Sequence, residues 1–148
     1  MHHPEIPALS HYVPAHEGPE DELAKTFPLQ LITWKGKNRA NSTQYANPWL
    51  IEAQQQKLWI NPQDAQKRGI AQGDTVRIHN ARGICEIPAE VTPRIIPGVV
   101  AMQAGAWWQP DAQGIDKGGC ANVLSSARIT ALAKGNSHQT MLVEVAKA

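Results

Sequence analysis

The chain has 148 residues, of which 42% are hydrophobic and 18% charged, and its formal net charge at pH 7 is +1. This length suffices for one domain with its own hydrophobic core and is short for two. The near-neutral balance argues against binding nucleic acid or an anionic membrane over the whole surface, so any electrostatic function must be local.

The two cysteines, Cys85 and Cys120, do not have CxxC spacing. This excludes a thiolate zinc site or an iron–sulfur cluster built from this chain alone, and it leaves a disulfide between them open. No window approaches the roughly 20 apolar residues that a membrane span requires. The start of the chain also lacks the cationic and apolar regions of a secretory signal. We therefore expect either a cytoplasmic protein or a piece of a longer one.

The first 22 residues contain four prolines and five acidic residues, with no Lys or Arg and no regular period. This composition predicts an extended segment that leads into the domain, and a disordered tail is an equal alternative. We place the linker at residues 1–24, following a preceding domain, and the folded domain at residues 25–148.

The first half of the domain alternates short elements with a polar loop. Apolar residues alternate over residues 27–31, which predicts a strand. Residues 34–43 are polar, aperiodic and rich in turn formers, so they predict a loop. A helix is predicted from Pro48 to about Gln56, because Asn47 can cap it and proline suits the first helical position.

The middle of the chain predicts a second helix and a β-hairpin. Residues 58–60 are an apolar run that suits a strand or a core anchor, and residues 61–69 repeat the Asn-Pro start and end on glycine. Apolar residues then alternate on both sides of the turn at residues 80–83, which is typical of a hairpin. Pro88 cannot donate a ladder hydrogen bond, so the second arm is expected at a sheet edge or with a bulge.

The last third of the domain is mostly loop. A turn at residues 97–98 leads into an apolar strand, and alternation returns only at residues 141–145. Residues 105–139 are rich in Gly, Asn and Ser, and a loop of this length in a compact domain is usually functional. Short strands, two short helices and long loops together predict a mainly β fold, a small mixed β-barrel.

The charges are distributed unevenly along the chain. No acidic residue lies between residues 23 and 51 or between residues 117 and 143, although both segments carry Lys and Arg. Both fall largely in predicted loops that are also rich in residues whose side chains and backbone N–H groups bind phosphate. We interpret them as two loops that together hold an anionic ligand; two solvated basic surfaces are the simpler alternative.

Single residues add weaker signals. Trp107 and Trp108 can stack on a planar ring or pack in the core, and His138 can donate to a ligand or be a surface residue. Cys120 is either a reactive thiol or a small buried residue. No arrangement of carboxylates, serine or cysteine indicates catalysis.

Several motifs resemble a known family. The run from Trp59 to Ile70, with Gly73-Asp74-Thr75-Val76 and Ala81-Arg82-Gly83 after it, resembles the molybdopterin-dinucleotide-binding domain that ends the catalytic subunits of the dimethyl sulfoxide reductase family. Residues 89–100 continue the similarity. Segments between Gly105 and Asn136 resemble the anaerobic dimethyl sulfoxide and selenate reductase branch. The resemblance covers nearly the whole chain from about Phe27.

The resemblance implies a double-psi β-barrel, related to the aspartate-decarboxylase barrel, that binds bis(molybdopterin guanine dinucleotide) with molybdenum. The cofactor would be shared with other domains, which would also supply the metal ligand and any iron–sulfur cluster. The two basic loops would contact the cofactor, while this domain would supply no catalytic or metal-ligating residue. The expected contacts are Trp34, Lys35, Lys37, Arg39, Asn41, Ser42, Thr43, Trp107, Asn122, Lys134, Asn136, His138 and Gln139.

The chain departs from this family in its first loop. Trp34, Lys35 and Asn41 stand where members of the family often have histidine. Lys35 and Asn41 can still donate hydrogen bonds to an anion. The individual contacts of the first loop therefore need not match those of the family, and the resemblance does not imply the same substrate.

The resemblance also implies partners and a place in the cell. The rest of the same catalytic subunit, an iron–sulfur electron-transfer subunit and a membrane anchor subunit are expected as partners, without nucleic acid. The chain itself does not reveal its localisation, and the resemblance implies the periplasmic face of the bacterial inner membrane. By itself the domain would be inactive as an oxidoreductase reducing an S-oxide, N-oxide or selenate.

Two other functions compete with this one. A stand-alone double-psi barrel can bind a protein or a nucleic acid through the same basic loops. A small barrel enzyme of the aspartate-decarboxylase type would need a self-processing serine at a strand junction, and no convincing one is present.

Overall fold

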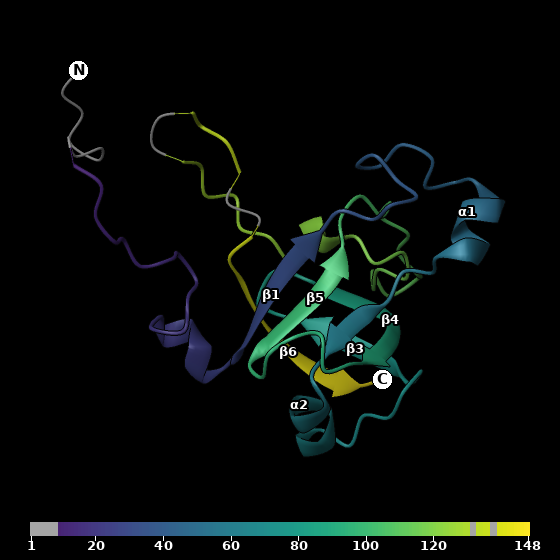
Figure 1. Ribbon diagram of the computed structural model, residues 1–148, viewed down its shortest axis with the longest axis horizontal. Coiled ribbons are helices and arrows are strands. Elements are labelled where there is room, and N and C mark those ends of the chain that lie inside the picture. The colour runs from purple at the N-terminus through teal and green to yellow at the C-terminus, as the bar shows by residue number, and fades with distance from the viewer. Residues whose placement is uncertain (1–8, 131–132, 137–138) are drawn as a thin grey trace.

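The computed structural model describes residues 9–130, 133–136 and 139–148, and these residues build a closed β-barrel (Figure 1). Going round the barrel, the strands follow the order β1-β5-β2-β4-β3-β6. Their bounds are β1 Leu29–Trp34, β2 Leu58–Ile60, β3 Thr75–His79, β4 Ile84–Val91, β5 Val99–Gln103 and β6 Met141–Lys147.

The pairing of the strands is mixed. β1 runs parallel to β5 and β2 runs parallel to β4, whereas the other four pairings are antiparallel. Parallel neighbours cannot be joined by a tight hairpin, so the chain between β1 and β5 and the chain between β2 and β4 must each cross from one end of the barrel to the other. The mainly β, double-psi barrel predicted from the sequence is confirmed.

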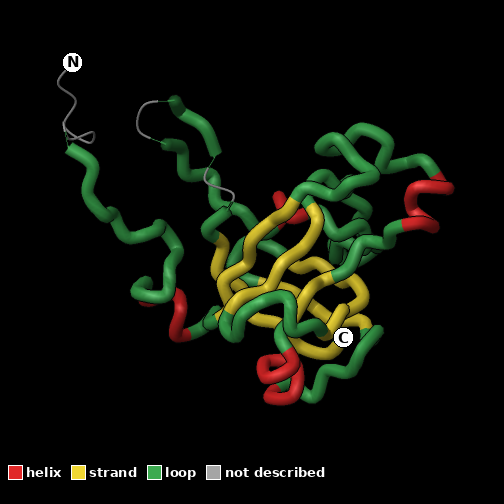
Figure 2. Tube along the Cα trace, in the orientation of Figure 1, coloured by secondary structure: helices red, strands yellow, loops and turns green. Residues whose placement is uncertain are grey.

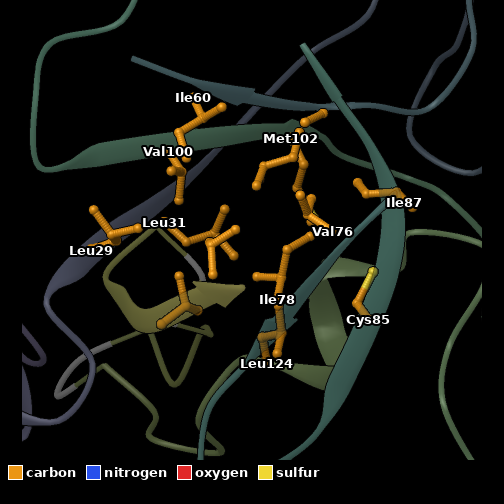
Figure 3. Packing of buried hydrophobic residues seen from close by; sticks show 14 of the residues in the cluster. Leu29, Leu31, Ile60, Val76, Ile78, Cys85, Ile87, Val100, Met102 and Leu124 are labelled. Carbon is orange, nitrogen blue, oxygen red and sulfur yellow. The ribbon is translucent and has the colours of Figure 1, made fainter. Parts of the chain in front are cut away.

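The core lies inside the barrel and follows the predicted alternation. Each strand turns every second side chain inward, as Leu29 and Leu31 of β1 and Val76 and Ile78 of β3 show. Figure 3 shows these side chains meeting those of Val100 and Met102 on β5 near the centre of the cluster. All of these side chains are almost completely buried, so the period of two in the sequence marks the core face.

The hairpin is confirmed, but the expectation that its second arm is an edge strand is wrong. β4 pairs with β3 on one side and with β2 on the other. The Glu86 N–H donates to the Asp116 carbonyl, on the side of β4 that faces away from β3. The Pro88 nitrogen faces the same side, and the pairing with β2 begins only at Ala89. A bulge does lie one residue further on: Gly73, with φ +83°, and Asp74 both bond to Ala89. Pro88 therefore interrupts no ladder bond.

The two predicted helices form with the expected caps. Asn47 accepts from the Trp49 N–H at the start of α1 (Pro48–Ala53), and Asn61 caps α2 (Pro62–Lys67) in the same way. α1 ends at Ala53, short of the predicted Gln56, because Gln54 is already extended as the chain turns toward β2. Two 3-10 turns complete the elements: η1 (Glu22–Lys25) and η2 (Ala121–Val123).

The long loop between β5 and β6 is confirmed, and its first half is organised by one buried carboxylate. Asp116 is fully buried and accepts hydrogen bonds from the backbone N–H groups of Gln109, Gly118 and Cys120, at 2.8, 3.1 and 2.6 Å. Charged acceptors make strong hydrogen bonds to backbone donors, so this residue fixes the path of the loop. Cys85 and Cys120 are both free thiols. Within the described ranges, no helix is long and apolar enough to cross a bilayer.

Candidate functional site

The site is built where two parallel strands end. Trp34 at the end of β1 lies opposite Gln103 at the end of β5, and the next N–H, that of Ala104, donates to the Trp34 carbonyl at 2.9 Å. Parallel strands send their following loops off the same edge. The loops after β1 and β5 therefore leave the barrel side by side, at the upper end in Figure 2 and away from α2.

A cleft of about 390 Å³ opens at this end of the barrel. It is lined by Thr33, Lys35, Asn41, Ser42, Ala104, Gly105, Ala106, Cys120, Ala121, Asn122 and Asn136. Both segments that lack acidic residues contribute to this lining, together with residues 104–106 at the end of β5, and no carboxylate is among the described residues that line the cleft. The two loops predicted to share a ligand thus face the same space.

The first loop is held by close contacts to the end of β5. A Cβ atom on Gly105 would lie 1.8 Å from the Asn41 carbonyl oxygen, so only glycine permits this approach. Asn41 itself has φ +54° and accepts a short hydrogen bond from Lys35 Nζ. Trp107 Nε1 donates to the Ser42 carbonyl at 3.1 Å. The polar groups of this loop are therefore positioned at the cleft and remain exposed to solvent.

The second acid-free loop, residues 117–140 and hereafter the late loop, is tied to β1 by two hydrogen bonds between Gln139 and Thr33. Gln139 Oε1 accepts from the Thr33 N–H at 2.9 Å, and Gln139 Nε2 donates to Thr33 Oγ1 at 2.8 Å. Asn136 forms an isolated bridge with Ile129, and Asn122 lies on η2. These contacts place Asn122 and Asn136 at the cleft although they are more than 75 residues from Lys35 in the chain.

A second hollow lies beside the cleft, around Arg39 and Tyr45. Arg39 Nη2 donates to Gln56 Oε1 at 2.6 Å, and its guanidinium stacks 5.1 Å from the centre of the Tyr45 ring. Burial lowers the pKa of Arg39 and raises that of Tyr45, because it disfavours the charged form of each group. Arg39 Nε is buried without a hydrogen-bond partner, so the hollow presents a partly desolvated cation.

The predicted contact residues divide into two groups. Lys35, Asn41, Ser42, Asn122 and Asn136 line the cleft, and Gln139 borders it through Thr33. The remaining predicted residues are Trp34, Lys37, Arg39, Thr43, Trp107, Lys134 and His138.

The structure places the described residues of this second group elsewhere. Trp34 stacks on Trp59, with ring centres 5.0 Å apart, and faces a different hollow. Trp107 stacks on Tyr45, beside the hollow that Arg39 lines. The other described residues of the group, Lys37, Thr43 and Lys134, are exposed and are not among the cleft-lining residues. His138 lies outside the described residues.

Sequence reasoning missed the residue that joins these loops. Gln56 accepts from Arg39 and donates to the carbonyl groups of Gln103 and Gly119, at 2.8 and 3.0 Å. It thereby connects the first loop, the end of β5 and the late loop. Nothing in the local sequence distinguishes it from Gln54 and Gln55. Thr33 and Cys120 at the cleft were missed as site residues as well.

The fold and this cleft define a barrel domain that presents two polar loops on one rim. The family described as "Molydopterin dinucleotide binding domain" matches residues 29–142. This match covers most of the chain, so the chain belongs to that family, and the resemblance found in the sequence is confirmed.

Two relatives of known type show which members of the family this chain is similar to. The chain is 52% identical to the dimethyl sulfoxide reductase DmsA of Escherichia coli (strain K12) over 143 residues, covering 96% of this chain and 17% of that protein. It is 39% identical to the trimethylamine-N-oxide reductase of Haemophilus influenzae over 135 residues, covering 84% of this chain and 16% of that protein. The chain thus spans about a sixth of the length of these relatives.

A solved structure supports the fold. The acetylene hydratase from Pelobacter acetylenicus superposes with a TM-score of 0.73 and 16% sequence identity, covering 90% of this chain and 21% of that one. At this identity the match concerns the barrel fold alone.

Proposed function

We propose that this chain is the cofactor-binding barrel of a molybdenum oxidoreductase and that its cleft holds part of bis(molybdopterin guanine dinucleotide). The observation that carries the proposal is the meeting of the two acid-free loops in one cleft. A second support is membership of the molydopterin dinucleotide binding domain family.

The residues at the cleft fit the chemistry of this cofactor. A pyrophosphate needs cations and hydrogen-bond donors, and a pterin or guanine ring also needs amide groups that donate and accept. Lys35 supplies the cation, Ser42 a hydroxyl, and Asn41, Asn122 and Asn136 supply amides. We therefore propose these five residues as the groups that hold the cofactor, with Gln139 positioning the late loop.

The bound cofactor would supply the oxygen-atom and electron transfer, while the protein supplies binding, orientation and electrostatics. Among the described residues, no group of three or more His, Cys, Asp or Glu is suited to a metal ion. We assign this domain the binding and orientation of the dinucleotide. The amides and the lysine do this by replacing the water that would otherwise solvate the phosphate and ring edges.

The whole protein is proposed to reduce an S-oxide or N-oxide, since its relatives include dimethyl sulfoxide and trimethylamine-N-oxide reductases; selenate remains a further candidate. The other domains of the subunit, an iron–sulfur subunit and a membrane anchor are the proposed partners. Residues 1–24 are proposed to lead into the barrel from a preceding domain.

The proposal is tested by titrating the chain with guanosine diphosphate and with inorganic pyrophosphate. Amide resonances of Lys35, Asn41, Asn122 and Asn136 should shift together in NMR spectra, because these residues line one cleft. The substitution Lys35→Gln should weaken binding about tenfold, since a hydrogen bond from a charged donor is lost.

The matched control is Lys67→Gln. It removes the same charge from an exposed lysine on α2, at the opposite end of the barrel (Figure 1). Binding should be nearly unchanged in this variant. Equal losses in both variants, or shifts confined to one loop, would contradict the proposed site.

A further inference from the structure

The segment before the barrel contains an unusually buried acidic residue. Glu17 is only 2% exposed and has a φ of +57°, a backbone conformation that side-chain-bearing residues rarely adopt. A buried carboxylate and a strained backbone both cost free energy, so other contacts must hold this residue in place.

Those contacts come from Arg82 and β6. Arg82 Nη1 and Nη2 donate to the two carboxylate oxygens of Glu17 at 2.8 and 2.7 Å, and the N–H of Leu142 donates to the same carboxylate at 3.2 Å. A bidentate guanidinium–carboxylate pair fixes orientation as well as distance. The segment around Glu17 is thus fastened to the turn between β3 and β4.

Arg82 also holds the late loop. Its Nε and Nη2 donate to the carbonyl oxygen of Leu124 at 2.8 and 2.7 Å, and Asn80 Nδ2 donates to the same oxygen. Leu124 directly follows η2, and its own N–H returns to the carbonyl of Ala121. One guanidinium therefore connects Glu17 to the short turn that presents Asn122 to the cleft.

Two further contacts support this connection. Arg128, further along the late loop, lies 2.8 Å from His16 through its Nη1 atom and the His16 Nδ1 atom. A Cβ atom on Gly83 would lie 2.7 Å from the Val123 carbonyl oxygen, so the turn carrying Arg82 packs directly on η2. The leading segment thus contacts the late loop directly through His16 and indirectly through Glu17 and Arg82, and none of its described residues lines the cleft.

We propose that Glu17 and Arg82 are positioning residues that couple the segment leading into the barrel to the Asn122 side of the cleft. The ion pair orients Arg82, Arg82 holds the Leu124 carbonyl, and η2 is thereby kept in the position that a ligand needs. The inference rests on the proposed function for its ligand, while its structural part holds for the chain alone.

The first test uses no ligand. In Glu17→Gln, amide hydrogen exchange of Val123, Leu124 and Ser125 should become about fivefold faster or more, because the η2 turn loses its anchor. The amides of barrel strands, such as Ile87, report global unfolding and correct for it. Arg82→Lys is the alternative variant for the case that Glu17→Gln folds poorly. It keeps the positive charge but loses the paired guanidinium hydrogen bonds, so it should accelerate exchange of the same amides.

Glu144→Gln is the matched control. Glu144 also pairs with an arginine, Arg68, at 2.7 Å, and its substitution changes the net charge equally. Arg68 caps the end of α2, at the end of the barrel away from the cleft (Figure 1), so the control should leave exchange of the η2 amides unchanged after correction. Equal acceleration of these amides in both variants would overturn the proposal.

The second test measures affinity for inorganic pyrophosphate by calorimetry. Glu17→Gln should weaken binding by about fivefold or more, whereas Glu144→Gln should not, because only the first pair is coupled to the cleft. Unchanged affinity and unchanged η2 exchange in Glu17→Gln would refute the coupling. Absence of pyrophosphate and guanosine diphosphate binding by the wild type would instead refute the proposed function, and the exchange test would still decide the coupling.

Discussion

The wall of the barrel and the rim that forms the cleft are stabilised by different interactions. The wall is held by strand pairing and by apolar side chains such as Leu31 and Ile78, which are fully buried. The rim is held by single polar contacts across loops, among them those of Gln56, Asp116 and Gln139. Burial of apolar area is additive over many contacts, whereas a polar contact depends on the geometry of a few atoms.

This difference explains how the domain combines a fixed scaffold with an exposed polar rim. The barrel positions the ends of β1 and β5, and the loops that follow can then expose amides and a lysine without needing a core of their own. A change in the wall should therefore affect global stability, while a change at the rim should affect local order and binding. The comparison can be tested by three substitutions or probes.

The largest effect is expected in the wall. Leu58 on β2 is fully buried, so Leu58→Ala leaves a cavity and should lower the free energy of unfolding by about 2–5 kcal/mol. Urea denaturation followed by circular dichroism measures this. Ile51→Ala, on the exposed helix α1, is the control and should cost about 0.5 kcal/mol or less. Similar costs for both variants would show that the core does not carry the stability.

An intermediate effect is expected at the junction between wall and rim. Glu86 of β4 bonds to Lys117 of the loop and to Arg77 of β3, at 2.7 Å for the latter. The hydrogen bond from Lys117, followed by that from Arg77, holds the pKa of the Glu86 carboxyl below the 4.5 that is usual for glutamate. The stabilisation is therefore present above about pH 4.5 and is lost as the pH falls through the lowered pKa.

The measurement is the free energy of unfolding of the wild type and of Glu86→Gln as a function of pH. The difference between them should be largest above about pH 5 and should shrink toward pH 3, because protonated Glu86 resembles glutamine. Glu22→Gln is the control, since Glu22 pairs with Lys25 on the surface, and its difference should stay small at every pH. A difference for Glu86→Gln that does not change with pH would contradict the stabilising ion pair.

The smallest effect concerns the two thiols. Cys85 is fully buried in the core, where burial raises its pKa, whereas Cys120 lines the cleft and is half-buried. Ellman's reagent should react with Cys120 more than about tenfold faster than with Cys85, which must await opening of the barrel. The variants Cys120→Ser and Cys85→Ala assign the two phases. Equal rates would mean that the wall opens as readily as the rim.

Much of the wall could be predicted because its signals are local. Alternation over residues such as Val76 and Ile78 marks strands, and Asn47 and Asn61 mark helix starts. Of the two alternatives expected at Pro88, the edge strand is wrong, because the sequence shows that a donor is missing but not which neighbour the nitrogen faces. The extra residues predicted for α1 have a similar cause, since only the approach to β2 ends that helix at Ala53.

The sequence indicated part of the candidate cleft, while the cofactor contacts themselves stay predictions. The absence of acidic residues from two loops is visible in the sequence, and five of the predicted contact residues do line the cleft. The sequence did not separate these from Trp34, which stacks on Trp59, or from Arg39, which bonds to Gln56. The direction of a loop side chain depends on contacts with distant segments, and those contacts have no local pattern.

The sequence alone determined which segments form strands and helices, the core face of each strand, the family and the two loops without acidic residues. These properties depend on neighbouring residues and on composition. Only the tertiary structure decided that β1 and β5 run parallel and end together, which brings Lys35 to the same cleft as Asn122. It also decided that Glu17 is buried under Arg82. Such contacts depend on strand order and register, which are set by the packing of the whole barrel.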